Sequence, residues 1–355
     1  MVKLFGLVSG IFAGPQRVSV TKRQHNLIEH LNAKVSGEML VDRPLLMSPY
    51  PPTLSPYEKP AQDGTIDWLV RYGIVCSKGV EDRVRRQGWT RCMARCYPNA
   101  SLVDLQWISD WVSWIFLFDD QNDEAEQGRG TERLTECRPL LLDIMRGGSA
   151  QDGNHMLQAW HDLWARIRPR VDPDWLERLT QQHDDYFLAC IWEASNRESG
   201  IIPDTNTYLL KRLDSGAVYP CLTIIEFVGQ LKLPEDVLCH PVVSDLSRST
   251  NNLICWSNDI VSLEKELKNG DMHNLVIALS NEHQISLQQA TDKAVVMHDT
   301  EMEHFDALVN QVPRFSTEID IDLQTYIDGL KFWIQGNLDW SFESQRYGAT
   351  SSHHR

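Results

Sequence analysis

The sequence predicts an all-α fold, and three observations support this prediction. From residue 62 onward, apolar residues recur at the three- and four-residue spacing of a helix. No segment shows the period of two that a half-buried strand requires. Prolines and capping residues stand where helices would begin. Since no linker or internal repeat interrupts the pattern, we expect one domain over residues 57–347, with about ten or more helices.

Helix boundaries follow from local chemistry. Ser101 precedes Asp104 by three residues, a capping-box pattern that opens a helix running into Asp119. Proline marks the first position of two further helices, at 173 and 241, and the second should reach about residue 268. A short helix after position 203 should break near Gly216 and Pro220. The last helix is expected over about residues 320–344.

The two ends of the chain differ from this helical region. Residues 1–56 have few helix signals, and prolines 49, 51, 52 and 56 favour an extended strap that wraps the surface, with no role assigned. The first 17 residues weakly resemble a signal peptide but lack a small-residue cleavage site, so we expect no export. Residues 348–355 are expected to be a disordered tail.

Charge and cysteine content narrow the possible function classes. The chain has 34 Lys and Arg against 49 Asp and Glu, so its net charge of -15 repels nucleic acid and anionic membrane surfaces. Metal ions can still reverse the local sign for a phosphate substrate. No apolar run approaches the roughly 20 residues of a membrane span. Eight scattered cysteines without a CxxC pair indicate reduced thiols in a cytoplasmic protein.

Three aspartates at the end of an apolar helix are the first candidate site. Asp119, Asp120 and Asp123 follow the apolar segment 111–118, and their spacing places them together at one helix end. Negative charge there opposes the helix dipole, so a cation is expected to compensate it. Carboxylate oxygens suit Mg²⁺ or Mn²⁺. The alternative is a solvated acidic loop that follows a buried helix.

A second polar cluster lies about 140 residues later, on another predicted helix. Asn258, Ser262 and Glu266 recur every fourth residue and therefore share one helix face. An amide oxygen, a hydroxyl and a carboxylate in line form a site for a hard cation. The alternative is a polar stripe on a surface helix, but residues 253–256 are apolar.

Taken together, the motifs DDQND and NDIVSLEKE resemble those of the microbial class I terpene synthases, DDxx(D/E) and (N/D)Dxx(S/T)xxxE. The resemblance covers about residues 57–347. It implies a helical bundle around a central apolar cavity, in which three Mg²⁺ ions hold the diphosphate of a linear isoprenyl substrate. The implied metal ligands are Asp119, Asp123, Asn258, Ser262 and Glu266. Asp120 would support the first motif.

The same resemblance implies contacts to the diphosphate. Arg212, 46 residues before Asn258, takes the position of the family's diphosphate-sensing arginine. Ser215 and Gly216 take the linker and effector positions at the helix break. Further donors to phosphate oxygens would be Lys265, Arg346 and Tyr347. From the residues alone, Tyr208 and Arg212 could instead form a mere surface pair.

Ionisation chemistry explains why such a site needs apolar walls. Heterolysis of an allylic C–O bond leaves a diphosphate anion, which metal ions and cationic donors stabilise. The remaining carbocation must be kept from water, and aromatic faces can stabilise it. Candidate cavity aromatics are Phe116, Tyr219, Trp333 and Trp340, although each could be ordinary core. His273 is assigned no role.

Several functions compete at this point. We expect a monomeric or homodimeric cyclase that converts farnesyl diphosphate to a sesquiterpene hydrocarbon or alcohol. Cyclases of C20 geranylgeranyl diphosphate or C10 substrates share these motifs. A chain-elongating prenyl synthase should carry two aspartate-rich motifs, and this chain has one. A non-catalytic isoprenoid-binding protein would tolerate the loss of ligands, but all the expected ones are present.

Overall fold

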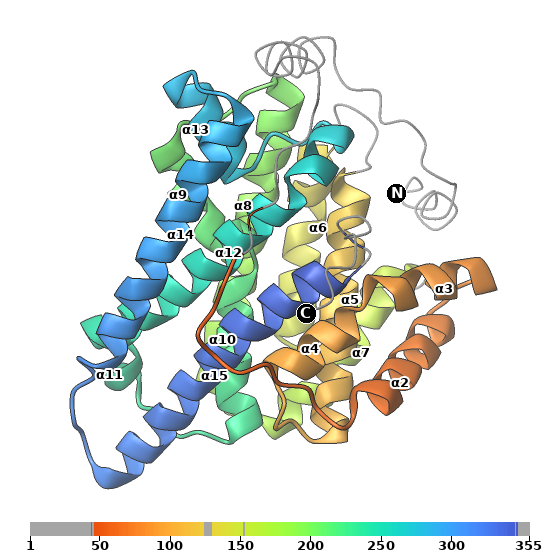
Figure 1. Cartoon of the computed structure of the whole chain (residues 1–355). Helices are drawn as coiled ribbons and strands as arrows, with labels where there is room; N and C mark the ends of the chain where they lie inside the picture. Colours follow the sequence, from red (N-terminus) through yellow and green to blue (C-terminus); the bar gives the residue numbers. More distant parts are fainter. Residues whose placement is uncertain (1–43, 45, 124–129, 152, 345, 347–355) are drawn as a thin grey trace.

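The computed structural model describes residues 44, 46–123, 130–151, 153–344 and 346 (Figure 1). Within these residues the secondary structure is entirely helical, which confirms the predicted all-α class. The helices are α2 (Glu58–Arg71), α3 (Lys78–Gln87), α4 (Trp89–Cys96), α5 (Leu102–Asp123), α6 (Gly130–Met145), α7 (His155–Ile167), the 3-10 helix η1 (Arg168–Arg170), α8 (Pro173–Ser199), α9 (Thr205–Ser215), α10 (Val218–Gly229), α11 (Glu235–Leu238), α12 (Pro241–Asn269), α13 (Leu275–His283), α14 (Leu287–Val309) and α15 (Thr317–Glu343).

The predicted helix starts coincide with capping contacts. The Ser101 hydroxyl accepts a hydrogen bond from the Asp104 backbone N–H at 3.2 Å before α5. Asp172 caps α8, and His240 caps α12, which extends one residue beyond the predicted end. Two boundaries differ from prediction. Helix α5 continues through Asp123, and α15 begins earlier because Ser316 caps it.

The break after Arg212 is confirmed, but it is shorter than predicted. Helix α9 ends at Ser215, Ala217 adopts a left-handed backbone with φ 52°, and α10 starts at Val218. Pro220 lies inside the first turn of α10, where a missing backbone N–H leaves no hydrogen bond unmade. The break therefore consists of Gly216 and Ala217, and Pro220 belongs to the next helix.

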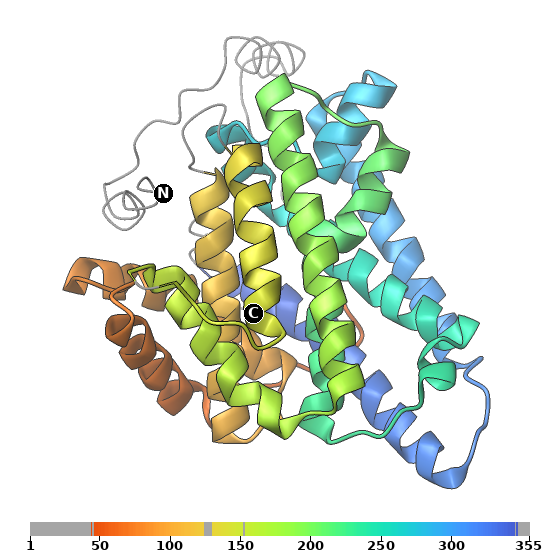
Figure 2. The same ribbon diagram turned by 180° about the vertical axis from the view of Figure 1, so that it is seen from behind.

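Helix α12 connects the elements that surround the site. It packs against α9, α10, α13, α14 and α15. On the opposite side of the bundle α6 and α8 lie side by side, as Figure 2 shows, and α8 also packs against α9 and α10. Helix α5 packs against α2, α4, α6 and α7. The two motif helices, α5 and α12, are thus linked by two routes: through α4 and α15, and through α6, α8 and α9.

The described part of the predicted strap is extended. Residues 46–57 run over the outside of the bundle to the start of α2 (Figure 1). The Tyr50 hydroxyl donates to Asp306 of α14 at 2.6 Å, and the Thr53 hydroxyl donates to the Arg95 carbonyl of α4 at 2.7 Å. Residues 1–43 and 348–355 lie outside the described residues, so the predictions for them remain untested.

The cysteines and the helix lengths agree with two further predictions. All eight cysteines are free thiols, and only Cys76 and Cys239 are exposed. Among the described helices, none combines the length and apolar character needed to cross a membrane.

Candidate active site

The first motif lies at the end of α5, a helix whose apolar face is buried. Trp107, Trp111 and Trp114 are each about 1% exposed and hold this helix in the core. Burial raises the pKa of Asp119 to about 6, and the Asp120 charge adds to the rise, while Arg346 and Lys265 oppose it. Asp119 therefore interacts with charges on both α12 and the C-terminal segment. The Asp123 side chain lies outside the described residues.

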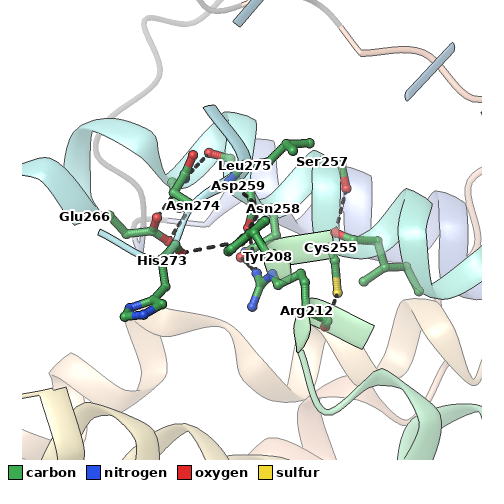
Figure 3. Close-up of polar contacts among 12 residues, drawn as sticks. Tyr208, Arg212, Cys255, Ser257, Asn258, Asp259, Glu266, His273, Asn274 and Leu275 are labelled. Atoms are coloured by element: carbon green, nitrogen blue, oxygen red, sulfur yellow. Dashed lines mark hydrogen bonds and ion pairs between the residues drawn. The ribbon is translucent and has the colours of Figure 1, made fainter. Parts of the chain in front are cut away.

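The second motif is preorganised by hydrogen bonds to Glu266. The Ser262 hydroxyl donates to Glu266 Oε1 at 2.6 Å. Asn274 Nδ2 donates to Oε2 of the same carboxylate at 2.7 Å (Figure 3). Burial raises the pKa of Glu266 to about 8, with Asp259 and Asp271 contributing. A bound cation would offset this cost of ionisation.

Arg212 and Asn258 meet directly. Arg212 Nη2 donates to Asn258 Oδ1 at 2.9 Å and forms an ion pair with Asp259 Oδ1 at 2.7 Å. Figure 3 shows the guanidinium directed from α9 toward α12. The predicted diphosphate-sensing arginine and a predicted metal ligand are therefore neighbours.

Asp259 anchors this arrangement, a role that the sequence analysis missed. It is fully buried and accepts hydrogen bonds from the Tyr208 hydroxyl at 2.6 Å and the Leu275 backbone N–H at 3.0 Å. The possibility that Tyr208 and Arg212 form only a surface pair is wrong, because Tyr208 is 1% exposed and both residues bind the same carboxylate. The signal available in the sequence was their four-residue spacing on α9, the third helix before α12.

Asn274 completes the anchor from the other side. Its side chain donates both to the Asp259 carbonyl at 2.7 Å and to Glu266, and its Oδ1 accepts from the Val276 N–H at 2.8 Å, capping α13. One residue thus fixes the start of α13 to the beginning and the end of the motif on α12. Its neighbour His273 is buried against Trp192 and Asn196 of α8.

Helix α8 contributes charges that the sequence analysis did not assign. Arg197 Nη1 lies 3.9 Å from Glu193 Oε2 and 3.8 Å from Asp271 Oδ2. The Glu193 charge acts both on Asp119, whose pKa it helps to raise, and on Arg212, whose pKa it helps to raise against the effect of burial. Glu193 is therefore electrostatically connected to the first motif and to Arg212, the residue that contacts the second motif.

The helix break packs tightly on α12. A Cβ atom added to Gly216 would lie 2.4 Å from the Cys255 sulfur, so no larger residue fits without movement. The Ser215 hydroxyl is buried and has no hydrogen-bond partner in the described part of the chain. Both residues lie where the resemblance expects a linker and an effector, although those roles themselves are untested.

The C-terminal arginine reaches the first motif. Arg346 Nη2 lies 3.1 Å from Asp120 Oδ1, and its guanidinium carbon stands 4.5 Å over the Phe116 ring. Phe116 is in turn stacked on Trp89 with ring centroids 5.4 Å apart, and it contacts Trp340. Phe116 and Trp340 thus support Arg346, while a cavity-lining role for them stays a prediction. Tyr347 lies outside the described residues.

The other two candidate aromatics lie on α15 and α10. Trp333 is 4% exposed and packs edge-on against Tyr97 at 5.4 Å. Tyr219 is partly buried on α10, and burial raises its pKa to about 12, with the Asp214 charge contributing. Contact with substrate is untested for both.

The donors fit a hard divalent cation. Among the described residues, no three His, Cys, Asp or Glu side chains form a metal site on their own. The predicted set differs from such a site because it uses an amide and a hydroxyl, Asn258 and Ser262, with the carboxylates of Asp119 and Glu266. Oxygen donors of this kind match Mg²⁺ or Mn²⁺ rather than Zn²⁺.

Comparison with solved structures identifies the class of protein. Germacradien-4-ol synthase from Streptomyces citricolor matches with a TM-score of 0.73 at 25% identity, over 83% of this chain and 99% of that one. Linalool/nerolidol synthase from Streptomyces clavuligerus has the same fold, with a TM-score of 0.75 at 23% identity, over 86% and 100% of the two chains. With these structural neighbours and the sequence relatives below, the protein is a terpene synthase, an enzyme of the lyase class.

Sequence comparison then places the chain in its family. The model of the family described as "Terpene synthase family 2, C-terminal metal binding" matches residues 110–304. (+)-T-muurolol synthase from Roseiflexus castenholzii is 36% identical over 309 residues, 87% of this chain and 94% of that protein. Germacrene A synthase from Nostoc punctiforme is 32% identical over 305 residues, 86% and 94% of the two proteins. The chain belongs to terpene synthase family 2, a family with a metal-binding C-terminal region.

Proposed function

We propose that this enzyme ionises farnesyl diphosphate with the help of Mg²⁺ and cyclises the allylic cation to a sesquiterpene hydrocarbon or alcohol. The observation that carries the proposal is the direct contact between Arg212 and Asn258, with Ser262 and Glu266 on the same helix face. Arg212, which would bind the diphosphate, thus lies beside the oxygen donors that would bind a metal ion.

The substrate length is supported by the relatives. The (+)-T-muurolol synthase of Roseiflexus castenholzii is named as an enzyme that cyclises (2E,6E)-farnesyl diphosphate, and it aligns with most of this chain. By extension we assign the C15 substrate here.

The metal ions, three by family resemblance, would be held by Asp119, Asp123, Asn258, Ser262 and Glu266, and would neutralise the charge of the departing diphosphate. Arg212, Lys265, Arg346 and Tyr347 would donate to its oxygens. The buried Nε of Arg212 has no hydrogen-bond partner among the described residues, so one donor of the anchored guanidinium remains for this contact.

The bond changes follow from this arrangement. The allylic C–O bond breaks, and its electron pair leaves with the diphosphate. A distal double bond of the substrate then attacks the allylic carbon, which closes a ring and moves the positive charge. Loss of a proton, or capture of water followed by loss of a proton, ends the reaction. We expect buried aromatic side chains to shield the cation from solvent.

Incubation with C10, C15 and C20 prenyl diphosphates tests the proposal. Each substrate is supplied with Mg²⁺, with Mn²⁺, or with a chelator, and volatile products are identified by gas chromatography and mass spectrometry. We expect a cyclic C15 product that requires the metal. Turnover of the C20 substrate alone would reassign the enzyme as a diterpene cyclase. Tight binding of all three substrates without any product would instead indicate a non-catalytic isoprenoid-binding protein.

A further inference from the structure

The C-terminal end of α15 is fastened to α4 by one buried arginine. Arg95 is 7% exposed, and its guanidinium forms a two-point ion pair with Glu343, at 2.6 and 3.3 Å. It also donates to Asp339 Oδ2 and to the Thr53 carbonyl of the strap, each at 3.0 Å. Arg95 therefore joins three segments: the strap, α4 and the last two turns of α15.

Glu343 is held from a second direction. Arg91, one helical turn before Arg95, donates to Glu343 Oε2 at 2.9 Å and to Glu58 of α2, also at 2.9 Å. The two helices approach closely just before this point, because a Cβ atom on Gly336 would lie 2.9 Å from the Arg95 carbonyl carbon. The last residue of α15 is thus placed by two arginines on a tightly packed neighbour.

Arg346 follows Glu343 by three residues, which span at most about 10 Å. The Arg346 side chain is only 6% exposed, contacts Asp120 of the first motif and lies over Phe116. Any shift at the end of α15 is therefore transmitted to a guanidinium that stands beside the metal motif.

We propose that Glu343, held by Arg95 and Arg91, is a positioning residue that sets where Arg346 meets the diphosphate. The inference rests on the proposed function, because it assumes that Arg346 contacts the diphosphate. The Glu343 side chain is 41% exposed, so burial in the core does not fix its position. Its two ion pairs, with Arg91 and Arg95, fix it instead.

Coulomb's law separates the two explanations by the direction in which diphosphate affinity changes. Glu343 is an acid near the proposed anion site, so neutralising it should strengthen diphosphate binding if it acts only through its charge. If Glu343 positions Arg346, the same change should weaken binding. The variant Glu343→Gln keeps the side-chain volume and leaves Arg95 with Asp339 and the Thr53 carbonyl.

The experiment measures binding of inorganic diphosphate in excess Mg²⁺ by titration calorimetry, independent of turnover. The proteins are the wild type, Glu343→Gln, Arg346→Ala and the double variant, with thermal unfolding recorded for each. Glu177→Gln is the matched control, because Glu177 also pairs with an arginine, Arg146, but on the exposed surface of α8. If Glu343→Gln unfolds early, Arg91→Gln removes one of the two arginines and replaces it in the series.

We expect Arg346→Ala to weaken binding about tenfold or more, the usual effect of losing a charged hydrogen bond. Glu343→Gln should weaken it about three- to tenfold, and the double variant should bind no worse than Arg346→Ala, since both act through one contact. Unchanged or tighter binding by Glu343→Gln overturns the inference, and so do multiplicative effects in the double variant. If Arg346→Ala binds diphosphate as tightly as the wild type, Arg346 has no part in the proposed function. The inference about Glu343 is then overturned as well.

Discussion

Arg212 and Asn258 lie 46 residues apart in the sequence and are joined by a hydrogen bond of 2.9 Å between Nη2 and Oδ1. The same guanidinium pairs with Asp259, the residue that follows Asn258. Because Arg212 contacts both Asn258 and the fully buried Asp259, a movement of α9 relative to α12 disturbs both contacts. In the proposed function, this contact would couple recognition of the diphosphate to recognition of the metal.

Removal of a proposed metal ligand should abolish turnover without unfolding the protein. We expect Asp119→Ala and Asn258→Ala each to lower kcat/KM for farnesyl diphosphate by about 100-fold or more, consistent with loss of electrostatic stabilisation of the leaving group. Circular dichroism should show unchanged helix content. Asp63→Ala on exposed α2 serves as the control, and full activity of either ligand variant contradicts the metal assignment.

The role of Arg212 can be separated from charge alone. Arg212→Lys keeps one positive charge but loses the planar arrangement that reaches Asn258 and Asp259 together. We expect Arg212→Lys to recover little of the diphosphate affinity lost in Arg212→Ala, about tenfold, when inhibition by inorganic diphosphate is measured. Unchanged kinetics in both variants would remove the assigned contact. Arg85→Lys, in a surface ion pair with Asp63, controls for the substitution itself.

The helix break should not tolerate a methyl group. Gly216→Ala places a Cβ atom 2.4 Å from the Cys255 sulfur, and overpacking of this kind costs about 1–3 kcal/mol of unfolding free energy. The Cys255 thiol also donates to the Arg212 carbonyl. Displacing this thiol should therefore disturb Arg212, and activity should fall as well. The double variant Gly216→Ala/Cys255→Ala removes the sulfur and should recover much of both losses. No recovery would show that the contact is not the cause.

A buried histidine predicts an acid-sensitive fold. His183 is fully buried; its Nε2 accepts from Trp111 Nε1 at 3.0 Å, and its Nδ1 lies 2.7 Å from the Leu179 carbonyl, so the neutral ring satisfies both contacts. Burial lowers its pKa to about 4. Since the unfolded chain binds the proton at about pH 6.5, this contribution to stability is present above that pH and lost toward pH 4, about 2 kcal/mol by pH 5.

Urea unfolding at pH 7.5 and pH 5.0 tests this prediction. His183→Gln can still accept from Trp111 but cannot titrate, so its stability should fall less between the two pH values. Asp119 and Glu266, whose pKa values are raised, act in the opposite direction but are present in both proteins. Equal pH dependence of the two proteins would contradict the assignment.

Much of the fold could be predicted because local chemistry marked it. Asp172-Pro173 and His240-Pro241 specify helix starts through capping and a fixed backbone angle, which depend on few other residues. The common face of Asn258, Ser262 and Glu266 follows from helix geometry alone. The start of α15 and the length of the break were harder to predict, because Ser316 and Pro220 fit more than one local structure.

The anchor residues could not be predicted, because their roles depend on packing between helices. Asp259 is one acid among several in the motif until α9 and α13 are placed on the same side of α12. Tyr208 looked equally suited to the surface, and only the structure shows its hydroxyl on Asp259. For Phe116, helix position alone could not reveal that Trp89 and Arg346 occupy its two faces.

The junction at Arg95 also has a consequence for how the chain is made. Its ion-pair partner Glu343 is translated 248 residues later. Until α15 has been translated, the Arg95 guanidinium can reach only one of its native hydrogen-bond acceptors, the Thr53 carbonyl. Helix α4 can therefore reach its final burial only after α15 has been translated and has packed against it.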